Sequence, residues 1–276
     1  EKKLLGTTSG GDAPNVEDVF STYLWTGTGA HQTITNGIDL DGEGGMVWTK
    51  GRAVVSNNVV IDTVRGEDNY LYTNTTGAEE TDGNFGIRAN SDGFDTSGVN
   101  FLVSGREHVS WTFRKAPRFF DVVTYSGNST DGREIAHNLG VAPGMIIVKS
   151  TSTAGYRWVV YHKTVGAQLA MYLDGTEANN AGNYGVYSSV PTESVFKLST
   201  SGYSNETGHD YVAYLFAHDP VGENDDGMIA CGSYTGTGAN QDIDLGWEAQ
   251  YTLIKKTNAS GTDWQVHDMM RGMAVG

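Results

Sequence analysis

Short apolar runs alternate with polar turn clusters along the chain from Val19 onward. The runs are rich in Val, Ile, Tyr, Thr and Trp, and clusters of Gly, Asn, Asp and Ser separate them. This pattern is typical of antiparallel strands joined by tight turns. Helical periodicity is nearly absent, since the best candidate, residues 164–173, is short and interrupted by Gly166. The pattern therefore predicts an all-β chain.

One pattern of residues occurs three times, beginning at Trp25, Tyr125 and Tyr234. Each copy opens with an aromatic residue followed by Thr or Ser and Gly, passes through a polar turn and an Ile-centred strand, and ends in an apolar run with Lys. The three apolar runs span residues 46–50, 145–149 and 252–256. The chain is therefore predicted to be a repeat protein.

Further matches extend the repeat over units of about 100 residues, which is too long for one turn of a solenoid. Segments that close with Gly follow in register at 62–66, 162–166 and 268–272. Trp158 and Trp264 each lie eight residues before that Gly, and the full units end in alternating strands at 108–113 and 210–216. Units of this length with roughly seven to nine short strands fit a β-sandwich of the jelly-roll or lectin-like kind. The predicted fold is a tandem array of such sandwiches.

The repeat and two Pro-containing links divide the chain into four segments. They are a leader at 1–17, a first β-sandwich at 18–116, a second at 117–226 and a partial third at 227–276. A half sandwich leaves an apolar sheet face uncovered. We therefore expect that the natural polypeptide continues past Gly276, or that another chain completes the third unit.

The chain is acidic, with 18 Lys and Arg against 33 Asp and Glu and a net charge of −15. Phosphate binding needs a basic surface, so this balance disfavours a nucleic-acid partner. No segment approaches the roughly 20 apolar residues of a membrane span, so membrane insertion is not expected. The single Cys231 excludes an intrachain disulfide, and its apolar surroundings at 228–231, read as a strand, favour a buried, inert thiol over a nucleophile.

Motifs that carry catalytic chemistry are missing from the sequence. The seven His residues lack metal-ligand spacing, and Asp62 and Asp268 stand where His162 would have to recur. There is no GxSxG elbow, P-loop or dinucleotide fingerprint. The sequence therefore predicts neither an enzyme nor a resident cofactor. The alternative that stays open is Ca²⁺ in an acidic Gly-rich turn, at residues 39–43, 92–95 or 225–226.

Aromatic residues, with 6 Trp, 14 Tyr and 9 Phe, are the more informative group. Those that recur in register are most simply core residues of each sandwich. Tyrosines in or beside the variable polar loops are candidates for stacking on sugars or contacting a partner. The candidates are Tyr72, Tyr172, Tyr184 and Tyr187.

Several motifs of the two full units are distinctive as a set. They are YSGNS at 125–129, HNLGVAPGMIIVK at 137–149, Trp158, VYH at 160–162, DTVRG at 62–66, SDGF at 91–94, VSW at 109–111 and DYVAY at 210–214. This set resembles a repeat of virion proteins from marine tailed bacteriophages, especially tail-fibre and other tail-associated proteins, over about residues 18–276. The first unit departs from it, with NGIDL at 36–40 in place of the longer turn, and the third lacks the Pro of that turn.

The resemblance implies a structural component at the surface of a virion, with lectin-like β-sandwiches and no catalytic residues. The leading hypothesis is a homo-oligomeric tail fibre or tail-surface adhesin that presents loops to host-surface glycans, with avidity raised by repetition. The alternative is a non-adhesive module, such as a capsid decoration or a fibre shaft, that contacts only other virion subunits. A depolymerase comes third, because it would need two close carboxylates in a groove.

Overall fold

The computed structural model describes residues 14–83, 86–97, 103–181, 185–219 and 227–273. It is mostly β, with 39% strand and 6% helix in several antiparallel sheets. The prediction of a β chain is therefore confirmed. No helix in these ranges is long and apolar enough to cross a bilayer.

The first strand group, residues 16–114, holds a six-stranded and a three-stranded antiparallel sheet. The six-stranded sheet has the order β1 (Phe20–Thr26), β9 (Glu107–Arg114), β3 (Gly45–Gly51), β4 (Val59–Asp62), β5 (Asn69–Tyr72) and β6 (Glu80–Thr81). The smaller sheet has the order β2 (Gln32–Thr35), β8 (Gly93–Thr96) and β7 (Ile87–Asn90). Two single-turn helices, α1 (Val16–Val19) and α2 (Leu40–Glu43), complete the group.

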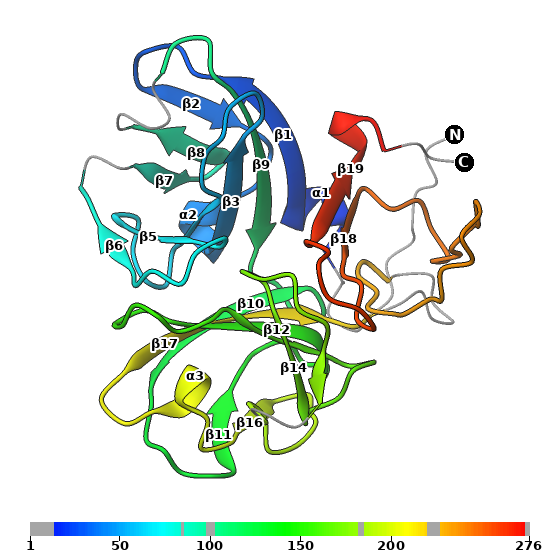
Figure 1. Ribbon diagram of the computed structural model, residues 1–276. Coiled ribbons are helices and arrows are strands. Elements are labelled where there is room, and N and C mark those ends of the chain that lie inside the picture. The colour runs from blue at the N-terminus through cyan, green and yellow to red at the C-terminus, as the bar shows by residue number, and fades with distance from the viewer. Residues whose placement is uncertain (1–13, 84–85, 98–102, 182–184, 220–226, 274–276) are drawn as a thin grey trace, which may run out of the picture.

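The second strand group, residues 120–217, follows the first directly (Figure 1). Its six-stranded sheet has the order β10 (Phe120–Ser126), β17 (Asp210–Ala217), β12 (Pro143–Ser150), β13 (Val159–His162), β14 (Leu169–Tyr172) and β15 (Asn180–Ala181). Beside it lie a small sheet of β11 (Arg133–Ala136) and β16 (Val195–Leu198) and a short helix, α3 (Gly202–Asn205). In both six-stranded sheets the first strand of the group pairs with the last, and the last pairs with the third.

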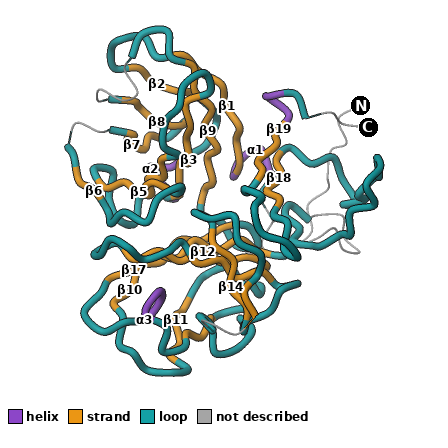
Figure 2. Tube along the Cα trace, in the orientation of Figure 1, coloured by secondary structure: helices purple, strands orange, loops and turns teal. Residues whose placement is uncertain are grey.

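The third strand group, residues 227–273, holds one hairpin of β18 (Tyr251–Ile254) and β19 (Gln265–Asp268), followed by the 3₁₀ turn η1 (Met269–Arg271). Most of this group is loop (Figure 2). The prediction of a strand at 228–231 is wrong, since only Ile229 forms a bridge there, to Asp219. The physical reason is the lack of a partner, because no described strand of the third group pairs with this segment.

The central strands of the large sheets, β3 and β9 in one and β12 and β17 in the other, are buried on both faces, which explains their nearly continuous apolar sequence. Along β17, Tyr211 and Leu215 point into the core of the second group, between its large and small sheets. The alternate residues Tyr214 and Phe216 point the other way, into a core shared with the first group. A third core, which includes Val47 from β3, lies inside the first group. Each large sheet is thus the middle layer between its own small sheet and the neighbouring group.

The shared core joins all three groups. Phe113 of β9 packs on Phe20, on Phe120 and Phe216 of the second group, and on Tyr251 of the third, with ring centroids 4.9 to 5.8 Å apart. Figure 1 shows the first group, the second group and the β18–β19 hairpin arranged around this centre. The three groups therefore pack around one common apolar core instead of forming independent units along the chain.

A buried lysine lies in the second group's large sheet. Lys149 of β12 has no exposed surface, and its Nζ donates to the carbonyl oxygen of Ser150 at 3.0 Å. Burial lowers the pKa of Lys149 from 10.5 to about 8, although the charge of Asp174 acts in the opposite direction. Lys149 therefore binds its proton less tightly in the folded state than in the unfolded chain.

The free energy of unfolding should rise between pH 8 and about 10, because there the unfolded chain binds more protons at Lys149 than the folded chain does. Lys149→Met should stabilise the protein at pH 7 by about 1–3 kcal/mol and abolish its share of this rise. The corresponding Lys50 of β3 is only half-buried, so Lys50→Met should have the smaller effect. Urea denaturation of both variants at pH 7, 8, 9 and 10 checks this, and a pH slope that persists in Lys149→Met would contradict it.

Candidate functional site: the contacts between strand groups

Two of the four predicted ligand-binding tyrosines are buried. Tyr172 is 5% exposed, and the Arg157 guanidinium lies over its ring at 4.2 Å. Tyr187 is 1% exposed, with its ring 5.3 Å from that of Tyr161. These rings are packed by other parts of the same chain, so they are not available for stacking on a sugar in this conformation.

The other two predicted tyrosines lie elsewhere. Tyr72 of β5 is half-buried, edge-on to Tyr70 with centroids 5.4 Å apart. Burial raises the pKa of Tyr72, so its hydroxyl stays protonated at neutral pH. Tyr184 lies outside the described residues. The three described tyrosines therefore do not line one exposed concavity, since two of them are buried.

The acidic turns have structural roles in the described residues. Asp39 caps α2 by accepting from the backbone N–H of Gly42 at 2.8 Å, and Asp95 accepts from the Thr33 hydroxyl at 2.6 Å. Asp225 and Asp226 lie outside the described residues. Across the part of the chain that the structure describes, no group of three or more His, Cys, Asp and Glu side chains is placed to hold a metal ion.

Cys231 is partly exposed, and its backbone N–H donates to Nδ1 of His218 at 3.1 Å. Burial of the sulfur raises the pKa of its thiol to about 12. The thiol is therefore protonated at neutral pH, which makes it a poor nucleophile.

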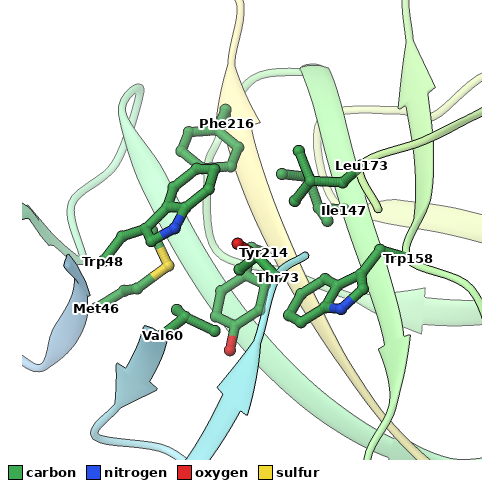
Figure 3. Close-up of a pocket in the computed structure, with 9 residues that line it drawn as sticks. All are labelled: Met46, Trp48, Val60, Thr73, Ile147, Trp158, Leu173, Tyr214 and Phe216. Carbon is green, nitrogen blue, oxygen red and sulfur yellow. The ribbon is translucent and has the colours of Figure 1, made fainter. Parts of the chain in front are cut away.

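A small cavity lies between the first and second groups. Figure 3 shows Met46, Trp48 and Val60 on one side of it and Trp158 and Tyr214 on the other. Its volume is ≈ 10 Å³, room for about one water molecule. The cavity is a small packing gap in the shared core, far below the size of a ligand site.

Around this core, charged and aromatic side chains of different groups meet. Asp62 at the end of β4 forms a buried ion pair with Arg65, Nε to Oδ2 2.6 Å. Tyr214 of the second group donates its hydroxyl to Asp62 at 2.7 Å and accepts from Nη2 of Arg65 at 3.1 Å. Glu79 pairs with Nη1 of Arg65 at 2.6 Å. Each buried polar atom in this cluster thus has a partner.

The Arg65 guanidinium faces two carboxylates in this cluster, those of Asp62 and Glu79. Burial alone would lower the pKa of Arg65, but Asp62, Tyr214 and Glu79 together raise it above its ordinary value. Burial raises the pKa of Tyr214 well above its ordinary value, so the phenol keeps its proton and can donate it to Asp62. The cluster is therefore a buried ion pair to which the Tyr214 hydroxyl is hydrogen-bonded on both sides.

A similar cluster joins the first and third groups. Asp268, at the end of β19, pairs with Arg271 at 2.6 Å and accepts from the indole N–H of Trp111 at 3.0 Å. The guanidinium of Arg271 lies over the Trp111 ring at 5.0 Å. In both clusters an Asp–Arg pair of one group therefore contacts an aromatic side chain from the last strand of another group.

Hydrogen bonds also recur between the second group and its two neighbours. Nε1 of Trp158 donates to the carbonyl oxygen of Tyr72 at 3.0 Å, and Nε1 of Trp264 donates to that of Tyr172 at 2.8 Å. Backbone bonds follow the same pattern: Gly155 to Thr76 at 2.8 Å with Gly261 to Thr176 at 2.9 Å, and Glu79 to Thr151 at 2.8 Å with Asn179 to Thr257 at 3.0 Å. The first–second and second–third contacts are therefore built alike.

Sequence reasoning singled out the residues of these contacts without seeing what they do. It noted the segments at 62–66 and 268–272 and the two tryptophans Trp158 and Trp264, but it read the tryptophans as core residues of separate sandwiches. The available signal was the shared spacing of Asp and Arg in the first and third segments. Spacing along a chain does not reveal that the partner comes from another strand group.

The geometry defines a class of multi-sheet antiparallel β protein whose strand groups are joined by repeated hydrogen bonds around one apolar core. The chain belongs to the family described as a domain of unknown function, DUF7483, whose model matches residues 15–275. The match spans all three strand groups as a single domain. No curated protein and no solved structure matches the chain.

Proposed function

We propose that the protein is a non-adhesive structural module of a virion, built from two tandem β-sandwich repeats and part of a third. The matching strand orders of the two large sheets and the recurring contacts between groups support the repeat. In the pairing register, Met46, Met145 and Tyr251 each lie opposite the first residue of the Gly-closed segment. This correspondence moves the third apolar run by one residue, from 252–256 to 251–255.

The observation that carries this choice over adhesion is the burial of Tyr172 and Tyr187. A sugar-binding tyrosine must present a ring face to solvent, whereas these rings and the carbonyl of Tyr172 are engaged within the chain. These two rings are thus accounted for by contacts inside the chain. In this proposal the protein has no catalytic activity, forms a homo-oligomer and contacts other subunits at the particle surface.

Adhesion to host-surface glycans is the second candidate, and one observation favours it. The half-buried rings of Tyr156, Tyr203 and His209 lie together beside the second group, with Tyr156 centroids 6.0 Å from Tyr203 and 5.3 Å from His209. Such a partly exposed aromatic surface is the kind that sugars stack on.

Binding of the isolated protein to host cells and to purified surface polysaccharide, with the oligomeric state determined by light scattering in the same sample, separates the two candidates. The structural proposal expects a defined oligomer without saturable glycan binding. Saturable binding that is lost in Tyr156→Ala, but kept in Tyr72→Ala as a control at the half-buried tyrosine that ends β5, would replace it with adhesion.

A further inference from the structure

Corresponding residues in the three strand groups differ in whether an aromatic side chain from a neighbouring group packs against them. We define a receiving position in each group by two residues. The first residue pairs with Met46 of β3, Met145 of β12 or Tyr251 of β18, and the second lies three positions later in the chain. The first position (Asp62, Arg65) receives Tyr214, and the position in the third group (Asp268, Arg271) receives Trp111. The aromatic side chain comes from the last strand of a large sheet in both cases, from β17 and from β9.

The receiving position of the second group consists of His162 and Val165. It is less covered than that of the first group, because Met145 and His162 are half-buried where Met46 and Asp62 are buried. In the order set by the other two contacts, the second group would receive an aromatic residue from the last strand of the third group. No described residue forms that strand.

The third group also has an open strand edge. In the large sheets, β3 lies between β4 and β9, and β12 lies between β13 and β17. Among the described strands, β18 pairs only with β19. An unpaired edge of this kind exposes backbone N–H and C=O groups that can pair with another strand.

Exposed apolar side chains lie in the same group. Tyr234, Ile243 and Leu245 are 52%, 43% and 36% exposed, whereas Trp25 and Ile34, at the places in the first group that correspond to Tyr234 and Ile243, are 6% and 3% exposed. The outward face of the hairpin is different, because Gln265 and His267 are polar and exposed there. Among its described residues, the third group thus lacks both a strand beside β18 and a second layer over these apolar side chains.

We propose that β18 binds an antiparallel β-strand supplied by a partner chain, and that this strand places an aromatic side chain over His162 and Val165. Its sequence pattern follows from the two existing strands of this kind. Both read Val-x-aromatic-x-Phe, as Val109-Ser-Trp111-Thr-Phe113 in β9 and Val212-Ala-Tyr214-Leu-Phe216 in β17. In the register of Trp48 with Trp111 and Ile147 with Tyr214, the new aromatic residue lies opposite Leu253.

The bound strand would close the arrangement of three groups around the shared core. Each group would then receive one aromatic side chain from a neighbour and donate one to the other neighbour. This inference rests on the correspondence between the three groups proposed above, and it holds whether the protein serves as a scaffold or an adhesin.

A fluorescent peptide with the β9 sequence, EHVSWTFR, tests the proposal on the full chain. Saturable binding is expected in fluorescence anisotropy, with slower hydrogen exchange at residues 251–254. Replacing the peptide's Trp by Ala should weaken binding by about tenfold or more, because a buried Trp anchor dominates contacts of this kind. Leu253→Asp in the protein should also weaken binding by about tenfold, since it places a charge against the inserted strand. His267→Asp, on the outward face, is the matched control and should bind normally.

A second variant keeps the test independent of any folding defect in Leu253→Asp. The double substitution His162→Asp and Val165→Arg rebuilds the Asp–Arg pair of the other two receiving positions, and it should tighten peptide binding by about tenfold through the indole hydrogen bond and cation–π contact. Absence of binding, protection away from both residues 251–254 and residues 162–165, or an unchanged affinity in the double variant would overturn the proposal. Glycan binding and oligomer size do not enter this test, so its outcome and that of the functional proposal are separate.

Discussion

Arg65→Ala should destabilise the protein by about 3–5 kcal/mol, because it leaves the buried carboxylate of Asp62 without its counter-ion. The side chain of Arg65 is only 3% exposed, so water cannot replace the guanidinium at Asp62. The substitution also frees Glu79 and removes one of the two bonds to the Tyr214 hydroxyl. The loss should therefore appear as a lower urea midpoint with little change in the m-value.

Arg271→Ala is the matched control for this prediction. Arg271 makes the same 2.6 Å contact with Asp268, but its side chain is 28% exposed and it has no second acidic partner in the described residues. Its loss should cost less than half as much as that of Arg65, since solvent can hydrate the carboxylate once the guanidinium is gone. Equal losses in the two variants would show that exposure does not control the strength of these pairs.

The local pattern along the chain was sufficient to predict a chain of mostly antiparallel strands, although not every strand. Alternating apolar residues and Gly-rich turns set where strands begin and end, and the spacing of Trp158 and Trp264 pointed to corresponding places in different parts of the chain. The runs at 145–149 and 212–216 are apolar on both faces, which is the sequence sign of a sheet buried on both sides. From the sequence, both runs are predicted only as strands within a single sandwich.

The contacts between groups were not predictable in the same way. Tyr172 and Tyr187 lie beside polar loop sequence, yet long-range packing buries them under Arg157 and beside Tyr161. Likewise, residues 228–231 have the composition of a strand, but a strand forms only where a neighbour supplies hydrogen-bond partners. Burial and pairing of this kind depend on which distant segments meet, and local sequence does not encode that directly.

Phe113→Ala should destabilise the protein by about 3–5 kcal/mol, the usual cost of removing a buried aromatic ring. Phe113 is 3% exposed and its ring contacts Phe120 and Phe216 of the second group and Tyr251 of the third. The cavity therefore lies where the three groups meet. We expect the groups to lose part of their coupling, so that hydrogen exchange in β18 and β19 becomes faster than in the second group.

Phe196→Ala distinguishes loss of coupling from loss of stability. Phe196 of β16 is also fully buried, but it packs inside the second group, against Tyr125 and Tyr187. It should cost a similar free energy of unfolding while hydrogen exchange in the β18–β19 hairpin stays close to that of the unchanged protein. If both variants speed hydrogen exchange in the hairpin equally, the three groups unfold as one unit. The shared core would then contribute no less to cooperative unfolding than the core of a single group does.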